Sequence, residues 1–223
     1  MTRKLHAFPL SPYCRKVRLA LAEKGLGVDL IDTKPWERPH DLVRLNPAGE
    51  TPVLVEADGR AIVDSNAICE YLEEAYPEHP LLPQRLDARA EARRLVAWFD
   101  GRFRAEVTET LLDEKVMRRM RRDGVPDSDY IRLGAANLRA HLDYIDQLAD
   151  RRNWLAGEAL TLADFAAAGH LSCLDYIGEV DWSGHPAART WYARIKSRPA
   201  FRTLLSDHVP GVPAAEHYTD VDF

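Results

Sequence analysis

The chain has 223 residues, which is enough for one large domain or two small ones with a sizeable core. Its hydrophobic content of 46% and charged content of 29% are ordinary for a globular protein, and its net charge of −5 argues against general nucleic-acid binding. No apolar run approaches the roughly 20 residues of a membrane span. The 3 cysteines are far apart, so we expect a cytoplasmic protein without a disulfide framework or a metal cluster.

Strand and helix patterns alternate in the first third of the chain. An apolar strand over residues 5–10 leads into an amphipathic helix, Arg15–Lys24, which Gly25 terminates. A second strand is expected at Val28–Thr33 and a short helix at Asp41–Leu45. The first three of these elements form a βαβ unit.

A hairpin and a further helix follow. Val53–Val55 and Ala61–Val63 flank the dipeptide Asp58-Gly59, which is typical of a tight turn between antiparallel strands. The next helix has Asp64 or Ser65 as its cap and an apolar stripe along one face. The order βαβ-α-ββα predicts a thioredoxin-like domain.

The chain is expected to form two domains and a tail. A proline-rich, aperiodic linker at residues 77–86 separates the thioredoxin-like domain, residues 1–76, from an all-helical domain, residues 87–208. An irregular tail follows at residues 209–223. Two apolar stripes with helical spacing mark the helical domain: Leu95, Val96, Phe99, Phe103 and Val107, then Leu138, Leu142, Ile145 and Leu148.

Three helices are predicted towards the end of the chain. Thr161 and Asp164 resemble a capping box at the start of an almost entirely apolar helix, Phe165–Ile177, which we expect to be central and buried. Two more helices follow at Pro186–Lys196 and Pro199–Leu205. Thr161 and Asp164 are interpreted as folding determinants and not as catalytic residues.

The tetrapeptide Ser11-Pro12-Tyr13-Cys14 joins the first strand to the first helix. A Cys-Pro-Tyr-Cys sequence at such a junction is the redox site of glutaredoxins, and here Ser11 replaces the first cysteine. The replacement removes dithiol chemistry but keeps a hydroxyl at a helix N-terminus, which favours an anion. We expect Ser11 to donate a hydrogen bond to the thiolate of a bound ligand such as glutathione. The alternative is that Ser11 only caps the helix.

Cys14, two arginines of the first helix and a later basic run are each open to two interpretations. Cys14 is interpreted as a small side chain packed in the helix, and the alternative is a leftover resolving cysteine or a glutathionylation site. Arg15 and Arg18 either add positive charge near the same turn or are merely solvated. The basic run Lys115–Arg122 is interpreted as the exposed side of a helix, with docking of an acidic partner as the alternative.

Four motifs in this order resemble those of the glutathione S-transferase superfamily. They are Ser-Pro-Tyr-Cys-Arg-Lys-Val-Arg from Ser11, Asn-Pro-Ala-Gly-Glu-Thr-Pro-Val-Leu from Asn46, Asp-Ser-Asn-Ala-Ile from Asp64, and Leu-Thr-Leu-Ala-Asp from Leu160. The resemblance covers nearly the whole chain. It implies a homodimer with the family's fold, an α/β thioredoxin-like N-terminal domain followed by an all-α C-terminal domain.

The resemblance also implies a glutathione site. Ser11 would be the catalytic hydroxyl, and Thr51-Pro52 would form the family's cis-proline turn, which presents the backbone of Val53 to the cysteinyl part of glutathione. Asp64 and Ser65 would bind the γ-glutamyl group through a carboxylate and a helix N-terminus. Asp64 stands where the family usually has Glu or Gln and is one methylene shorter, which counts against tight binding.

Glu50 is a second departure from the family pattern. Many relatives carry a basic or amide side chain at this position, near the glycyl carboxylate of glutathione. A glutamate there would repel that carboxylate, unless Lys34, Arg38 or His40 compensates for its charge.

Other segments resemble the FzlA-type subgroup of the family, which consists of glutathione-transferase-like division proteins of alphaproteobacteria. They are Pro35-Trp36-Glu37, the run Arg152–Gly157 and the ending His217–Phe223. Members of this subgroup bind the tubulin-like protein FtsZ, and the resemblance places the binding residues at Trp36, Glu37 and Asp220. As alternatives, Trp36 is a wall of the substrate site or a dimer contact, and the tail is a strap across the helical domain.

Two hypotheses of different classes follow. The main hypothesis is an enzyme that binds glutathione as co-substrate, without a metal, and transfers its thiolate to a hydrophobic electrophile held against the helical domain. The alternative is a non-catalytic cell-division factor that kept the fold and binds FtsZ filaments. Asp64 and Glu50 favour the alternative, whereas Ser11 and the proline turn favour the enzyme.

Overall fold

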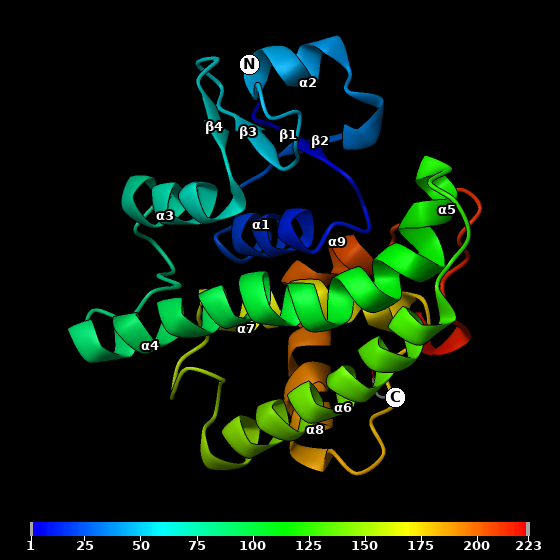
Figure 1. The fold of residues 1–223 in the computed structure, drawn as a ribbon. Helices are drawn as coiled ribbons and strands as arrows, with labels where there is room; N and C mark the ends of the chain where they lie inside the picture. Colours follow the sequence, from blue (N-terminus) through cyan, green and yellow to red (C-terminus); the bar gives the residue numbers. More distant parts are fainter. Residues whose placement is uncertain (1, 222–223) are drawn as a thin grey trace.

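The computed structural model of the protein describes residues 2–221, so Met1 and the last two residues of the predicted tail, Asp222 and Phe223, lie outside the described residues. The N-terminal part is built on a four-stranded sheet with the strand order β2-β1-β3-β4 (Figure 1). β1 pairs in parallel with β2, whereas the pairs β1–β3 and β3–β4 are antiparallel. The strands are β1 (Lys4–Ala7), β2 (Asp29–Asp32), β3 (Val53–Val55) and β4 (Ala61–Val63).

Three helices accompany the sheet: α1 (Pro12–Glu23), α2 (His40–Leu45) and α3 (Ser65–Ala75). α1 and α3 lie between the sheet and the helical domain, whereas α2 lies on the far side of the sheet (Figure 1). α1 begins three residues earlier than the predicted start at Arg15. Ser11 caps it, and Pro12 occupies its first turn, where an N–H group is not needed.

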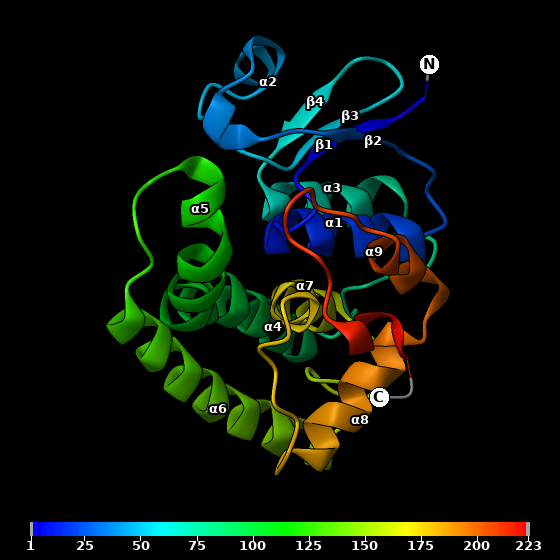
Figure 2. The ribbon, with the colours of Figure 1, turned by 90° about the vertical axis from the view of Figure 1, so that its right-hand side faces the viewer.

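The C-terminal part is helical, as predicted. Three helical segments follow one another without a gap in the sequence: α4 (Leu86–Ala97), the π-helical segment η2 (Trp98–Met117) and α5 (Arg118–Arg121). The next helix, α6 (Ser128–Arg151), packs against η2. α7 (Leu162–Tyr176) lies at the centre, and α8 (Pro186–Lys196) packs against α6 (Figure 2). The two apolar stripes expected from the sequence are buried in this core. The fold is therefore the expected one, a thioredoxin-like part followed by an all-helical part.

α7 is buried along its whole length, which confirms the expectation for this segment. Its start is a capping box, in which Asp164 accepts a hydrogen bond from Thr161 N at 2.8 Å and the Thr161 hydroxyl accepts one from Ala163 N at 3.3 Å. Asp164 also accepts hydrogen bonds from Leu155 N and Trp191 Nε1, so it joins α7 to two other segments. Among the described helices, neither α7 nor any other is long and apolar enough to cross a lipid bilayer.

The thioredoxin-like part rests on α7 through α1. A Cβ atom at Gly169 of α7 would lie 2.6 Å from the Pro12 carbonyl oxygen and 3.3 Å from Lys16 N, so a residue with a side chain would push the two helices apart. Because Gly169 permits this close approach, the N-terminus of α1 is held against the middle of α7. The position of Ser11 relative to the helical domain depends on this contact.

The tail packs back onto the molecule after the short segments η3 (Pro199–Phe201) and α9 (Arg202–Leu205). Tyr218, in the turn η4 (Glu216–Thr219), is buried, and its hydroxyl donates a hydrogen bond to Leu204 O at 3.2 Å. Arg15 of α1 donates a hydrogen bond to the same hydroxyl at 3.2 Å, and Ala215 N donates one to Tyr176 O at 2.8 Å. The described part of the tail is therefore a strap across the helical domain and α1.

Candidate functional site

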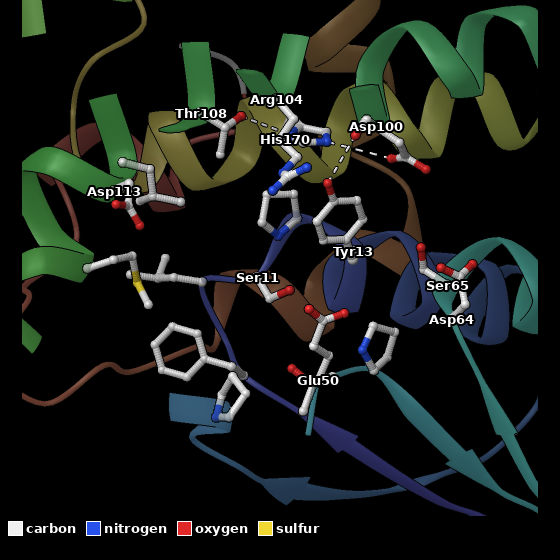
Figure 3. A pocket seen from close by; sticks show the side chains of 18 of the residues that line it. Ser11, Tyr13, Glu50, Asp64, Ser65, Asp100, Arg104, Thr108, Asp113 and His170 are labelled. Atoms are coloured by element: carbon white, nitrogen blue, oxygen red, sulfur yellow. Dashed lines mark hydrogen bonds and ion pairs between the residues drawn. The ribbon is translucent and has the colours of Figure 1, made fainter. Parts of the chain in front are cut away.

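A cavity of about 670 Å³ lies between the sheet domain and the helical domain (Figure 3). The N-terminus of α1, the loop before β3 and the start of α3 line one side, while η2, the adjoining turn of α5 and His170 of α7 line the other. Of the residues expected to contact glutathione, five line this cavity: Ser11, Thr51, Pro52, Asp64 and Ser65. The sixth, Val53, does not line it. The structure thus brings together residues from three separate motifs.

Ser11 lies at the N-terminus of α1 and is partly exposed (Figure 3). Its Oγ accepts a hydrogen bond from Cys14 N at 3.3 Å, which is the capping interaction. Capping uses a lone pair of the hydroxyl and leaves its proton to be donated elsewhere. The two interpretations of Ser11, cap and hydrogen-bond donor to a ligand, are therefore compatible.

The peptide bond between Thr51 and Pro52 is cis, as the resemblance implies. Both residues line the cavity, whereas Val53 is fully buried in β3, paired with His6 of β1 and Val63 of β4. Any contact of Val53 with a ligand would have to go through its backbone.

Asp64 and Ser65 lie at the N-terminus of α3. Asp64 is the cap of this helix, with Oδ1 accepting hydrogen bonds from Asn66 N at 2.7 Å and Ala67 N at 3.3 Å. Its φ of 70° lies in the left-handed region, which asparagine and aspartate tolerate better than most residues. Since both hydrogen bonds go to one oxygen, the second carboxylate oxygen can face a ligand.

Glu50 places a further carboxylate in the cavity. Figure 3 shows its side chain extending from the loop before β3 towards the space between Ser11 and Asp64. Glu50 is exposed, and no basic side chain of the described chain forms an ion pair with it. The charge of this carboxylate therefore acts directly on any ligand that lies beside Ser11.

In the part of the chain that the structure describes, none of the three basic residues that could offset the charge of Glu50 forms an ion pair with it. Lys34 pairs with Glu37 at 3.4 Å, Arg38 donates a hydrogen bond to Ala48 O at 3.2 Å, and His40 lies beside Asp41 at the surface. None of Lys34, Arg38 and His40 lines the cavity.

Polar groups that the sequence analysis did not single out lie where α1 meets the opposite wall. Tyr13 donates a hydrogen bond to the Asp100 backbone carbonyl at 3.0 Å, and burial raises the pKa of Tyr13 to about 12, so its hydroxyl is neutral. His170 is fully buried, with Nδ1 2.8 Å from Thr108 Oγ1 and Nε2 3.6 Å from Asp100 Oδ1. Burial lowers the pKa of His170, so the imidazole is neutral at pH 7.

Behind this wall, Lys16 of α1 forms a buried ion pair with Asp100 and donates a hydrogen bond to Asn66 Oδ1 at 2.8 Å. Burial alone would raise the pKa of Asp100, but the neighbouring His170 imidazole and the charge of Lys16 hold it below its ordinary value. Asp100 is therefore ionised. His170, one of the few polar residues of the mostly apolar α7, is the sequence feature that points to this cluster.

Cys14 and the two arginines of α1 do not face the cavity. Cys14 is fully buried, and burial raises the pKa of its thiol, which favours the packed interpretation over a reactive cysteine. The suggestion that Arg15 and Arg18 are merely solvated is wrong. Both are buried, and both pair with Asp207, Arg15 at 3.3 Å and Arg18 at 2.8 Å.

The residues expected to contact a protein partner lie in two places. Trp36, in the turn η1 (Pro35–Glu37), is half-buried, packs edge-to-face on Phe8 with ring centroids 4.9 Å apart, and lines the cavity. Glu37 is exposed beside it, and Asp220 is exposed directly after η4. η1 comes directly before α2 beside the sheet, whereas η4 packs on the helical part of the molecule, where His217 Nε2 lies 3.0 Å from Asp175 Oδ1 of α7. The structure therefore does not gather these residues into one patch.

The basic run Lys115–Arg122 lies mainly on an exposed side of the molecule. Val116 is buried, and Met117 and Met120 are half-buried against the core. Three of its cations already form ion pairs with acidic side chains of the same protein: Lys115 with Glu179, Arg118 with Glu114 and Arg121 with Asp113. These contacts support the interpretation as a solvated helix face.

Across the part of the chain that the structure describes, no group of three or more His, Cys, Asp and Glu side chains is arranged to hold a metal ion. The cavity itself is lined by hydroxyl, carboxylate, aromatic and guanidinium groups.

Comparisons with known proteins agree with the fold and the motifs. The family model "Glutathione S-transferase, N-terminal domain" matches residues 5–80, and "Glutathione S-transferase, C-terminal domain" matches residues 119–194. Over 224 residues the chain is 49% identical to the FtsZ-localized protein A of Caulobacter vibrioides (strain NA1000 / CB15N), covering 99% of this chain and 98% of that protein.

Several solved structures match the entire chain, among them two that are about half identical to it in sequence. The structure of FzlA from C. crescentus has a TM-score of 0.97 and 49% sequence identity, with 100% of both chains covered. A crystal structure described as a glutathione S-transferase from Rhodospirillum rubrum F11 has a TM-score of 0.97 and 53% identity, also with 100% of both chains covered. The descriptions of these similar proteins thus include both a division protein and a transferase.

Proposed function

This chain belongs to the glutathione S-transferase family, and from that premise we propose that it is a non-catalytic member, a cytoplasmic cell-division factor that associates with FtsZ filaments. The observation that carries the proposal is the 49% identity to FtsZ-localized protein A, which extends over 99% of the chain. Of the two hypotheses drawn from the sequence, this alternative is better supported than the enzyme.

The electrostatics of the cavity also favour a non-catalytic role. A glutathione thiolate beside Ser11 would share the cavity with the carboxylate of Glu50. Two like charges repel, although water and salt screen a carboxylate as exposed as that of Glu50. The repulsion opposes the stabilisation that a hydrogen bond from the Ser11 hydroxyl would give the thiolate. It therefore raises the pKa of a bound thiol relative to a site without Glu50.

We assign the filament contact to Trp36, Glu37 and Asp220. Trp36 is held by its edge-to-face contact with Phe8 and remains half-exposed, so little side-chain freedom is lost when a partner covers it. Because these residues lie in two places, a filament could contact both. A homodimer, as is usual in the family, would double the number of contacts along the filament.

The test is co-sedimentation with FtsZ filaments assembled with GTP. Wild-type protein is expected to pellet with the filaments, and Trp36→Ala is expected to stay in the supernatant. Tyr130→Ala is the matched control, because Tyr130 is an aromatic side chain that is 55% exposed and lies on α6, away from Trp36. Equal pelleting of the wild type and Trp36→Ala would refute the assignment of Trp36, and no pelleting of the wild type would refute the function.

A second candidate, a glutathione transferase, is favoured by one observation: Ser11 stands at the N-terminus of α1 beside a cis Thr51-Pro52 bond. In that case Ser11 stabilises the thiolate, Asp64 and Ser65 hold the γ-glutamyl group, and Leu112 and Met117 face a hydrophobic electrophile across the cavity. Turnover of an aryl halide with millimolar glutathione tests this. Activity that Ser11→Ala removes would support the enzyme, and no turnover together with no glutathione binding would exclude it.

A further inference from the structure

We propose that β2, at the edge of the sheet, binds an extended basic segment of a partner protein as an additional strand. This goes beyond the filament contact assigned to Trp36, Glu37 and Asp220, because it names a different element and the chemistry of the chain that binds there.

The free side of β2 presents backbone groups that can form a further ladder. Asp29 N and Thr33 N donate hydrogen bonds of 2.9 Å each to carbonyl oxygens of β1 and of the residue before it. Because alternate residues of a strand pair on opposite sides, the N–H and C=O groups of Leu30 and Asp32 point away from β1. β2 stands first in the strand order, and no backbone group in the described part of the chain pairs with Leu30 or Asp32 on that side. An extended chain can bind there by strand addition.

Apolar side chains are exposed along the same strand. Leu30 is 47% exposed and Ile31 36%, whereas Ile62 and Val63 of β4, the strand at the opposite edge, are half-buried. Leu30 is the register partner of Leu5, which is fully buried. The apolar face of the sheet therefore continues to the edge at β2, and an added strand would bury its exposed end.

The carboxylates of β2 select the charge of the added strand. Asp29 accepts a hydrogen bond from Thr2 and has Lys4 beside it on β1. Asp32, at the other end of β2, forms no ion pair with any residue that the structure describes. A lysine or arginine on the added strand is attracted to Asp32, and an acidic side chain is repelled. Salt weakens both effects, because the strand is exposed.

These charges also argue against a second copy of this chain as the occupant. Pairing β2 with itself would bring Asp29 and Asp32 of both copies into one short two-stranded ladder, where like charges are destabilising. Leu30 and Asp32 share one face of β2, since side chains alternate along a strand. The complement is a segment with an apolar and a basic residue at the same spacing, two positions apart.

The strand leads directly to a half-exposed aromatic ring. β2 ends at Asp32, η1 begins at Pro35, and Trp36 of this turn packs on Phe8, the residue after β1. A segment that lies along β2 therefore reaches Trp36 beyond the C-terminal end of the strand. Contact with this ring adds apolar area to a ladder of only 4 residues.

The test is NMR on the intact ¹⁵N-labelled protein with three capped peptides. They are Arg-Thr-Val-Thr-Arg, Glu-Thr-Val-Thr-Glu and Arg-Thr-Pro-Thr-Arg. The first peptide has an arginine two positions to either side of valine, so it fits β2 in both strand directions. The second reverses its charge, and the third keeps the charge but lacks the central N–H group that a ladder needs.

We expect only the first peptide to bind at millimolar concentration. Its binding should slow hydrogen exchange of the Leu30 and Asp32 amides, which gain a partner. The amides of Asp29 and Thr33 already bond towards β1, so their exchange should change little and serves as the internal control.

Variants of β2 separate the charge from the backbone contribution. Asp32→Lys is expected to weaken binding of the basic peptide at least about tenfold, equivalent to about 1.4 kcal/mol. Glu74→Lys is the matched control, because Glu74 is an exposed carboxylate of α3, which packs against β4 at the opposite edge. Leu30→Pro removes a free N–H group and should abolish binding, and edge strands accept proline where the N–H faces solvent. Thermal unfolding shows whether each variant is folded.

The proposal is wrong if the basic peptide does not bind, if it binds without slowing exchange at Leu30 and Asp32, or if Asp32→Lys binds it as tightly as Glu74→Lys. Protection of these two amides that rises with protein concentration in the absence of peptide would show pairing with a second copy, and would also overturn it. FtsZ co-sedimentation is scored separately. Its absence with intact peptide binding contradicts only the division role, and the reverse result contradicts only this proposal.

Discussion

Gly169→Ala tests the contact that holds the two domains together. Gly169 lies in α7 where α1 crosses it, and an added Cβ atom would lie 2.6 Å from the Pro12 carbonyl oxygen. The neighbouring atom belongs to the backbone and cannot swing away like the end of a long side chain. The substitution therefore has to move the N-terminus of α1, and Ser11 with it.

Two opposing contributions set the size of the effect. Alanine is about 0.8–1.0 kcal/mol more favourable than glycine inside a helix. Overpacking a close-packed interior costs about 1–3 kcal/mol, and contact with rigid backbone places this site at the upper end. The net expectation is destabilisation by about 1–2 kcal/mol. For a chain of this length that lowers Tm by about 2–8 °C.

Gly101→Ala is the control, because Gly101 also lies in a helical segment and an added Cβ atom there would meet nothing within 4 Å. We expect this variant to keep its Tm or to gain a few degrees. Differential scanning calorimetry of the two variants and the wild type measures the contrast. If Gly169→Ala is as stable as Gly101→Ala, the account of how α1 rests on α7 is wrong.

Three further changes are expected to act through local contacts. Asp207→Ala removes the carboxylate that binds two buried arginines, and should lower the free energy of unfolding in urea by about 3–5 kcal/mol; a loss below 1 kcal/mol would contradict the buried pairing. Thr161→Ala removes the capping hydroxyl of α7 and should lower the free energy of unfolding in urea by about 1–2 kcal/mol. An unchanged free energy of unfolding would contradict this role of Thr161. Hydrogen bonds from Arg94 and Arg152 lower the pKa of Glu91 to about 2, from an ordinary value of 4.5. Its contribution to stability is therefore complete above pH 4.5 and lost as the pH falls towards 2. Glu91→Gln should consequently be less stable than the wild type at pH 6 but not at pH 2, and a difference that does not change with pH would contradict this.

Features whose partners lie a few residues apart were predictable from the sequence. The turn at Asp58-Gly59 joins β3 and β4 as expected, and Thr161 and Asp164 form the expected capping box. Asp64 caps α3 through N–H groups two and three residues away. Short-range hydrogen bonds and turn geometry decide these cases, and the residue types that satisfy them are few.

Interactions between distant parts of the chain were not predictable in this way. Because α1 lies between the sheet and α7, even its cationic side chains are buried. Arg15, for example, pairs with Asp207, which is 192 residues away in the sequence. The pairing of Lys16 with Asp100 and the cluster around His170 follow from the same packing. Nothing in the spacing of these residues reveals which of them meet, although a histidine within a wholly buried helix does indicate that a polar partner exists.

FtsZ co-sedimentation of Ser11→Ala and Trp36→Ala, measured side by side with the wild type, tests the central claim most directly. If the protein acts as a division factor without glutathione chemistry, Ser11→Ala should pellet with the filaments as the wild type does, and Trp36→Ala should not. Loss of pelleting in Ser11→Ala with normal pelleting of Trp36→Ala would contradict the account.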